Sequence, residues 1–251
     1  MGIVEVKNLS YTYPNASKPA IEDICLSINP GEFVLLTGPS GCGKTTFCRS
    51  LNGLIPKFYN GTLTGSVHIA GLDVSEHSTM ELAQHIGLIF QNPDNQIFAL
   101  TVEKDIAFGL ENLGISKAEM HREIDWASET TGIDSLRLRA THELSGGQKQ
   151  RLTIASVLAM PPSIIVRDEP TSFLDPVGAE HIFNVLDLLN KEYGMTIIII
   201  EHRIDIAAKY VNRIIVFDEG RVRSDGKPGL ILAQEDTRLL GGGIPRILEL
   251  A

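Results

Sequence analysis

Residues 38–45 have the composition of a loop that binds phosphate groups. They read Gly-Pro-Ser-Gly-Cys-Gly-Lys-Thr, the pattern GxxxxGKT, between an apolar run at 33–37 and a helix-like segment at 44–52. Glycines let backbone N–H groups turn toward phosphate oxygens, and a helix N-terminus favours negative charge. Lys44 can reach the β and γ oxygens of a nucleotide, and the Thr45 hydroxyl can ligate Mg²⁺. The predicted phosphate contacts are Gly38, Ser40, Gly41, Cys42, Gly43, Lys44, Thr45 and Thr46.

Two adjacent carboxylates follow a second apolar run. Residues 164–166 are Ile-Ile-Val, and Asp168 and Glu169 come after Arg167. At the carboxyl edge of a parallel sheet, such acids reach the crevice in which nucleotides bind. Asp168 suits the Mg²⁺ shell, and Glu169 can accept a proton from, or orient, the water that attacks a γ-phosphate. The pattern indicates hydrolysis of a nucleoside triphosphate.

Apolar, β-branched runs alternate with helix-like segments through much of the chain, which predicts an α/β fold with a mostly parallel central sheet. Runs such as 197–200 are apolar at consecutive positions, as expected of strands covered on both faces. Asp175-Pro176 supplies an N-cap and a first helical residue. The predicted strands are 3–6, 33–37, 67–70, 86–90, 164–166, 196–200 and 214–217, and the predicted helices are 44–52, 146–160 and 176–192.

From about residue 93 to residue 160 the strand-like runs disappear and helical periodicity dominates. We expect helices over 102–113, 116–131 and 148–160, packed as a subdomain inserted into the α/β core. Pro161-Pro162 ends the last of them and returns the chain to the sheet.

The pentapeptide Leu144-Ser145-Gly146-Gly147-Gln148 lies between the phosphate loop and the acid pair. Ser145 can cap a helix whose first amides form a second anion site. Together these motifs resemble those of ATP-binding-cassette (ABC) ATPases over nearly the whole chain. The resemblance implies a P-loop NTPase with ATP and Mg²⁺ as cofactors. It also implies that two cassettes pack head to tail, so that Ser145, Gly146, Gly147 and Gln148 of one close over ATP bound to the other.

Four further positions match the family pattern. Tyr13 resembles the aromatic residue that stacks on adenine, with Tyr11 as the alternative. Gln91 resembles the glutamine that touches Mg²⁺ and the attacking water, and Asp175 the residue that couples two active sites, although it also fits a plain helix cap. His202 resembles the histidine that contacts the γ-phosphate. The implied catalytic residues are Glu169, His202 and Gln91, and the implied metal ligands are Thr45, Gln91 and Asp168.

The resemblance also divides the chain. Residues 1–91 and 161–240 are expected to form the P-loop ATP-binding core, which includes an N-terminal antiparallel β portion. Residues 92–160 are expected to form the helical subdomain with the signature motif, and 241–251 the start of a C-terminal extension.

Three residues depart from the commonest cassette patterns. Arg167 stands where an aliphatic residue is usual, and a charge in a doubly covered strand is costly unless it is paired or reaches the sheet edge. Arg167 is therefore a candidate for tuning the site. Glu201 and Phe173 also differ, and neither removes a catalytic group.

Composition narrows the class of partner. The chain has 251 residues and a formal net charge of −9, so it lacks the broad basic face that nucleic-acid binding depends on. Its apolar stretches are shorter than the ~20 residues that span a bilayer, and no secretory signal is visible. Three cysteines, Cys25, Cys42 and Cys48, form neither a disulfide framework nor a zinc motif. We expect no nucleic-acid partner and a peripheral position at the cytoplasmic face of the membrane.

The loops around residues 54–65 and 91–98 are most similar to those of the ATPase subunits of energy-coupling factor (ECF) importers, which take up vitamins or transition-metal ions. This similarity implies a second ATPase subunit, identical or paralogous, an integral membrane subunit that contacts residues 92–112, and a small solute carried by that partner. The alternative is a soluble cassette ATPase in DNA repair, translation or iron-sulfur assembly. A P-loop kinase would not need residues 144–148 at all.

Overall fold

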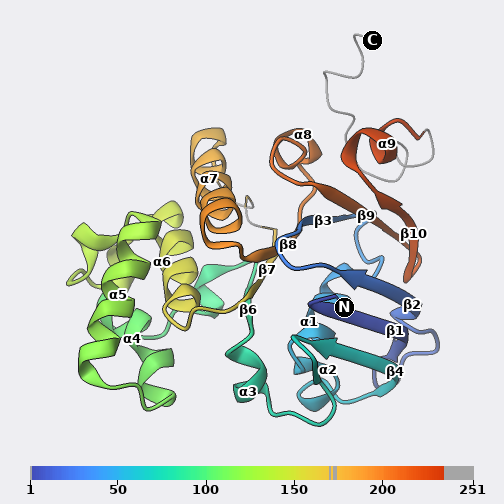
Figure 1. The fold of residues 1–251 in the computed structure, drawn as a ribbon, viewed down its shortest axis with the longest axis horizontal. Coiled ribbons are helices and arrows are strands. Elements are labelled where there is room, and N and C mark those ends of the chain that lie inside the picture. The colour runs from blue at the N-terminus through green and yellow to red at the C-terminus, as the bar shows by residue number, and fades with distance from the viewer. Residues whose placement is uncertain (1, 170, 172–173, 235–251) are drawn as a thin grey trace.

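The computed structural model describes residues 2–169, 171 and 174–234. Figure 1 shows a group of helices on one side, a six-stranded sheet through the middle, and a smaller sheet on the other side. No helix in these residues combines the length and apolarity that crossing a membrane requires. The C-terminal extension expected at 241–251 lies outside the described residues.

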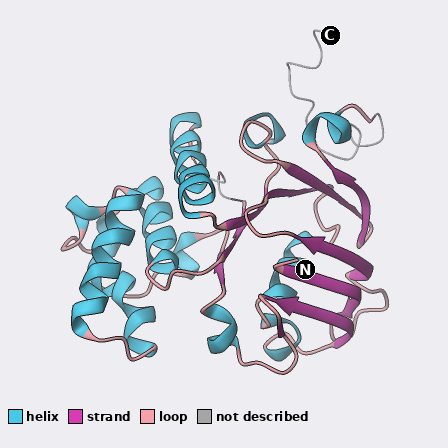
Figure 2. Ribbon diagram, viewed as in Figure 1, coloured by secondary structure: helices cyan, strands magenta, loops and turns pink. Residues whose placement is uncertain are grey.

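The two sheets differ in strand direction, as Figure 2 helps to follow. The smaller one is antiparallel and has the order β2-β1-β4-β5. The larger has the order β10-β9-β3-β8-β7-β6, with every pair parallel except β10 with β9. These sheets confirm the predicted α/β fold with its antiparallel N-terminal portion. The strands are β1 (Val4–Thr12), β2 (Ile21–Ile28), β3 (Phe33–Thr37), β4 (Thr62–Ile69), β5 (Leu72–Asp73), β6 (Ile86–Ile89), β7 (Ile164–Asp168), β8 (Thr196–Ile200), β9 (Arg213–Asp218) and β10 (Arg221–Gly226).

Three helices of the described chain pack together beside the large sheet. α4, α5 and α6 contact one another, and α6 also contacts β6. They begin at residues that favour helix starts: Ser116 and Ser145 each accept a backbone N–H from the third residue of the helix that follows. The helices are α1 (Lys44–Leu51), α2 (Leu54–Lys57), α3 (Thr79–Ala83), α4 (Val102–Asn112), α5 (Lys117–Thr131), α6 (Gly146–Leu158), α7 (Pro176–Tyr193), α8 (Ile204–Ala207) and α9 (Pro228–Leu232).

The central strands are buried on both faces, which explains their continuous apolar runs. In β3, Phe33 and Leu35 join a core shared with α4 to α7, whereas Val34 and Leu36 join a second core beside α1 and the small sheet. β8 divides its isoleucines between the same two cores. At ~1.5–3 kcal/mol for each fully buried aliphatic side chain, these strands hold the two halves of the molecule together.

Strand β2 was not predicted, and its register explains why. The β1–β2 pairing shifts between Val6 and Leu9 and again between Leu9 and Tyr11. Because of these shifts, the buried residues Ile21 and Ile24 of β2 are three positions apart rather than two. The period-2 alternation by which a half-buried strand is recognised is therefore confined to Ile24, Leu26 and Ile28, and the start of the strand lacks it.

The parallel arrangement brings three strand ends to one edge. Because β3 pairs with β8 and β8 pairs with β7, their carboxyl ends lie side by side. The phosphate loop follows β3, Glu169 follows β7, and His202 follows β8 after one residue. The fold thus gathers the predicted chemistry at the place where nucleotides bind to open α/β sheets.

Candidate functional site

The phosphate loop has a backbone that requires glycine. Gly38, Gly41 and Gly43 have φ values of +134°, +79° and +102°. A Cβ atom on Gly38 would lie 2.0 Å from the Phe217 carbonyl oxygen, and one on Gly43 would lie 2.5 Å from that of Ala20. Side chains cannot fit at these two positions, so the loop keeps its backbone open toward a phosphate chain. Ser40 and Gly41 lie exposed at its tip.

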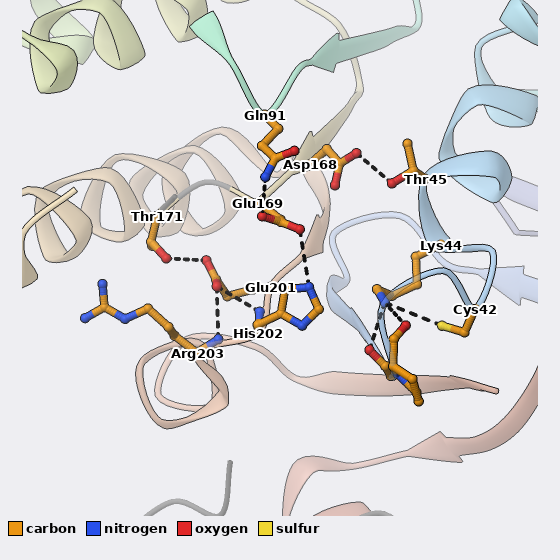
Figure 3. A network of polar contacts seen from close by, with 12 residues as sticks. Cys42, Lys44, Thr45, Gln91, Asp168, Glu169, Thr171, Glu201, His202 and Arg203 are labelled. Carbon is orange, nitrogen blue, oxygen red and sulfur yellow. Dashed lines mark hydrogen bonds and ion pairs between the residues drawn. The ribbon is translucent and has the colours of Figure 1, made fainter. Parts of the chain in front are cut away.

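Lys44 is only 5% exposed and its ammonium group points back into the loop (Figure 3). Nζ donates to the carbonyl oxygens of Gly38 and Pro39, each at 2.8 Å, and contacts the Cys42 sulfur at 3.4 Å. These contacts hold a positive charge at the centre of the loop. Phosphate oxygens are charged acceptors and can replace the carbonyl oxygens as partners of the ammonium group.

Thr45 and Asp168 meet across the gap between α1 and β7. The Thr45 hydroxyl donates to Asp168 Oδ2 at 2.8 Å. A hydroxyl and a carboxylate are oxygen ligands of the kind that Mg²⁺ takes from a protein when phosphates supply others. This donor pair fits the predicted Mg²⁺ site, which Gln91 would complete. A cleft of about 500 Å³ opens beside it, lined by Thr45, Arg49, Tyr59, Phe90, Gln91, Asn92, Asn95 and Asp168.

Burial raises the pKa of Asp168, and the neighbouring Glu169 carboxylate raises it further, although the Thr45 hydrogen bond opposes both. A carboxyl pKa that is higher in the folded state makes the ionised group destabilising above that pKa. The cost is relieved as the pH falls through the folded value.

We therefore expect Asp168→Asn to raise the melting temperature of the nucleotide-free protein at pH 7, because Asn removes the buried charge and still accepts from Thr45. The gain should shrink as the pH is lowered toward 4. The same variant should lose the stabilisation that Mg-ATP gives the wild type. Calorimetry with and without Mg-ATP checks both results, and a lower melting temperature at pH 7 without nucleotide would contradict the argument.

Glu169 lies between Gln91 and His202 (Figure 3). Gln91 Nε2 donates to Glu169 Oε2, and His202 Nε2 lies 3.2 Å from Glu169 Oε1. The Glu169 amide donates to the Ile200 carbonyl at 2.9 Å, which extends the pairing of β7 with β8 by one residue. Glu169 has a φ of +46°, a backbone region that costs a non-glycine residue energy and clusters at functional sites. The three residues predicted to be catalytic therefore form one contiguous group.

The two tyrosines of β1 and the following turn differ in exposure. Tyr11 is completely buried, and its hydroxyl donates to the Asn60 carbonyl oxygen. Tyr13 is half-buried, its ring meets Tyr11 edge-on at 4.8 Å, and its hydroxyl lies 3.1 Å from that of Thr46. Only Tyr13 of this pair has a surface to offer to a base, so Tyr13 remains our candidate for stacking on adenine.

The signature segment starts α6 with a reciprocal cap. Ser145 Oγ accepts the Gln148 amide at 3.3 Å, and Gln148 Oε1 accepts the Ser145 amide at 2.8 Å. Gly146 and Gly147 have ordinary φ values, and a Cβ on either would meet nothing in the described chain closer than 3.9 Å. The fold of one chain therefore does not require glycine there.

Asp175 caps α7, accepting the Gly178 amide at 2.8 Å, as its cap interpretation expects. Its side chain is exposed, so the coupling role stays a prediction. The departure at Phe173 lies outside the described residues.

No site role was predicted for Glu201 or Thr171. Both are buried, and Glu201 contacts the backbone of His202. Thr171 donates to Glu201 Oε2 at 2.6 Å, and both residues are 3% exposed. The signal in the sequence that could have identified Glu201 is its charge directly after the buried strand β8. A second charged residue, Arg167, lies within the neighbouring strand β7. Arg167 is completely buried in β7, which lies between β6 and β8 and is not an edge strand.

Known proteins are similar to this chain in sequence. A family model described as ABC transporter matches residues 21–172. A relative from Pyrococcus abyssi (strain GE5 / Orsay), named for an ABC transporter ATP-binding protein, is 49% identical over 91% of this chain and 81% of its own length. The energy-coupling factor transporter ATP-binding protein EcfA1 of Latilactobacillus sakei subsp. sakei (strain 23K) is 43% identical over 96% of this chain and 84% of its own.

A solved structure is also similar to this chain. CbiO1 from Clostridium perfringens, described as part of the ABC transporter complex cbiONQ, superposes with a TM-score of 0.84 and 35% sequence identity, covering 99% of this chain and 98% of its own. These matches confirm the resemblance inferred from the motifs and favour a transporter over the soluble alternative. This chain belongs to the ABC transporter family and is one of its ATP-binding, ATP-hydrolysing cassettes.

Proposed function

We propose that this cassette powers an ECF-type importer of a vitamin or a transition-metal ion from the cytoplasmic face of the membrane. The similarity to EcfA1 and CbiO1 supports the importer class. The observation that carries the proposal is an exposed apolar surface formed by α4 and the segment that precedes it. Its residues, which we call the docking surface, are Phe98, Leu100 and Phe108.

The three side chains of the docking surface are exposed to solvent and held in place by their neighbours. Phe98, Leu100 and Phe108 are 62%, 78% and 44% exposed, and the rings of Phe98 and Phe108 meet edge-on at 4.2 Å. Asp105 is buried and accepts the amides of Phe98 and Ala99, each at 3.1 Å. A rigidly held group of aromatic and aliphatic side chains in water marks an interaction site, here for the membrane subunit.

The same proposal assigns the chemistry. Lys44 and the loop amides hold the β- and γ-phosphates of ATP, Tyr13 stacks on the adenine, and Glu169 accepts a proton from the attacking water. His202 and Gln91, both in contact with Glu169, orient the γ-phosphate and the water. Thr45, Asp168 and Gln91 would hold Mg²⁺, which neutralises charge on the phosphates.

A second cassette completes the site in this proposal. In the part of the chain that the structure describes, no neighbouring atom requires glycine at positions 146 and 147. In Figure 1, α6 belongs to the helical group and α1, which follows the phosphate loop, lies across the large sheet from it. Close approach of another molecule's nucleotide to the bare backbone at the start of α6 accounts for both glycines.

Membrane recruitment tests the docking surface. Phe98→Asp should lower the affinity of the cassette for its membrane subunit by about 30-fold, the ~2 kcal/mol typical of a central aromatic anchor, and leave basal ATP hydrolysis intact. The matched control is Leu230→Asp, since Leu230 is 69% exposed but lies on α9. The measurement is the fraction of tagged cassette retained on membranes of the source organism. Equal retention of Phe98→Asp and wild type would exclude this surface.

A further inference from the structure

Two charged residues are buried directly behind the catalytic group. Arg167 is 0% exposed and immediately precedes Asp168 in β7, and Glu201 is 3% exposed and immediately precedes His202 after β8. The two strands are neighbours, with Arg167 opposite Ile199 and Asp168 opposite Ile200. Each charge therefore lies next to a residue of the proposed machinery, although neither belongs to it.

The Glu201 carboxylate joins two segments of the site. Its Oε1 accepts the amides of His202 at 2.8 Å and Arg203 at 3.0 Å, and its Oε2 accepts the Thr171 hydroxyl at 2.6 Å (Figure 3). Thr171 follows Glu169 by two residues. One buried carboxylate thus fixes both the backbone that carries His202 and the chain that leaves Glu169.

The buried guanidinium gives this carboxylate a counter-charge. Burial lowers the pKa of Arg167 to about 9, and the Glu201 carboxylate acts in the opposite direction. Arginine is not deprotonated in proteins at neutral pH, so Arg167 carries a positive charge here. Burying either charge without the other would cost several kcal/mol of folding free energy. The burial of both, in β7 and directly after β8, is therefore consistent with mutual stabilisation.

The catalytic side chains need this support. His202 is exposed, with 41% of its side chain accessible, and its contact with Glu169 is a single ion-pair distance of 3.2 Å. A displacement of about 1 Å in such a group can cost about 10²-fold in rate. A buried carboxylate that clamps the backbone at His202 limits that displacement.

We propose that Glu201, with Arg167 as its buried counter-charge, is a positioning residue that holds His202 and Glu169 in their reacting geometry. The inference rests on the proposed roles of His202 and Glu169. In this proposal Glu201 contacts neither the nucleotide nor the attacking water. It acts through the backbone of the next residue, His202.

The test is made in an Arg167→Met background, so that removing Glu201 does not leave a buried guanidinium without its counter-charge. In Arg167→Met, adding Glu201→Ala should lower kcat by about tenfold or more with little change in the KM for ATP, because the clamp on His202 is lost. Glu201→Gln in the same background keeps one oxygen for the two amides and should retain most of the kcat. Circular dichroism and melting temperatures confirm that each variant is folded. Glu32→Gln, which weakens the remote ion pair with Arg213, is the matched control and should leave kcat unchanged.

A second measurement separates positioning from mere stability. If Glu201 acts through His202, Glu201→Ala should cost little more once His202→Ala is present in the same background. Fully multiplicative losses, or wild-type kcat in the folded Arg167→Met/Glu201→Ala protein, would overturn the inference. A failure of the proposed catalytic role of Glu169 looks different, because Glu169→Gln would then keep its turnover, and a failure of the importer proposal would leave all of these kcat effects in place.

Discussion

Glu169→Gln is expected to lower ATP turnover by about 10²- to 10⁴-fold and to leave ATP binding intact. Glutamine has nearly the same shape and can keep a hydrogen bond to Gln91, but it cannot accept a proton from water. Without hydrolysis, the ATP-bound pair of cassettes should persist. The readouts are kcat, equilibrium ATP binding, and the mass in solution with Mg-ATP.

The chain supplies its own control for Glu169. Asp218 ends the buried strand β9 and Glu219 follows it, and Glu219 has a φ of +44°, close to the +46° of Glu169. Glu219 follows β9 rather than β7, and the contacts that Gln91 and His202 make with a carboxylate in the described residues go to Glu169. We expect Glu219→Gln to hydrolyse ATP like the wild type. Normal turnover in Glu169→Gln would contradict the assignment of the base.

Lys44→Ala is expected to weaken ATP binding by about 10- to 100-fold, the equivalent of one charged hydrogen-bonding group worth ~1.5–3 kcal/mol. The Lys44 ammonium is buried in the loop and has three contacts there, to the carbonyl oxygens of Gly38 and Pro39 and to the Cys42 sulfur. Because Lys44 is proposed to hold the β- and γ-phosphates, its loss should weaken the binding of ATP and ADP and spare that of AMP. Equilibrium binding of the three nucleotides measures this pattern.

Lys191→Ala is the matched control, since Lys191 pairs with Asp187 on the surface of α7, away from the loop. Its affinity for ATP should equal that of the wild type. An equal loss for ATP and AMP in Lys44→Ala would show general damage to the loop rather than a missing phosphate contact.

The elements that the sequence predicted best are those with a strong local signal. β3 and β8 have the predicted bounds because each is an uninterrupted apolar run buried on both faces. α7 begins at Pro176, where the Asp175 cap indicated. β10 was not predicted, because its residues, Arg-Val-Arg-Ser-Asp-Gly, form a polar edge that buries little and so has no apolar pattern.

The candidate site could be predicted only where a motif names the residue. The motifs placed Thr45, Asp168, Glu169 and His202, and the structure brings them to one sheet edge. The clamp by Glu201 depends on the pairing of β7 with β8 and on the side chain of Thr171, which no local pattern encodes. Arg167 was recognised from the sequence as a charge that is costly to bury. Its counter-charge, Glu201, could be identified only from the pairing of β7 with β8.

Capture of the membrane partner tests the central claim most directly. Tagged Glu169→Gln protein with Mg-ATP is incubated with detergent-solubilised membranes of the source organism, and the retained proteins are identified by mass spectrometry, with Phe98→Asp/Glu169→Gln as the control. The account predicts recovery of a multi-spanning membrane protein that the control loses, together with a small substrate-binding subunit whose ligand reveals the solute. Recovery of soluble partners alone, or of ribosomes or DNA, would contradict it.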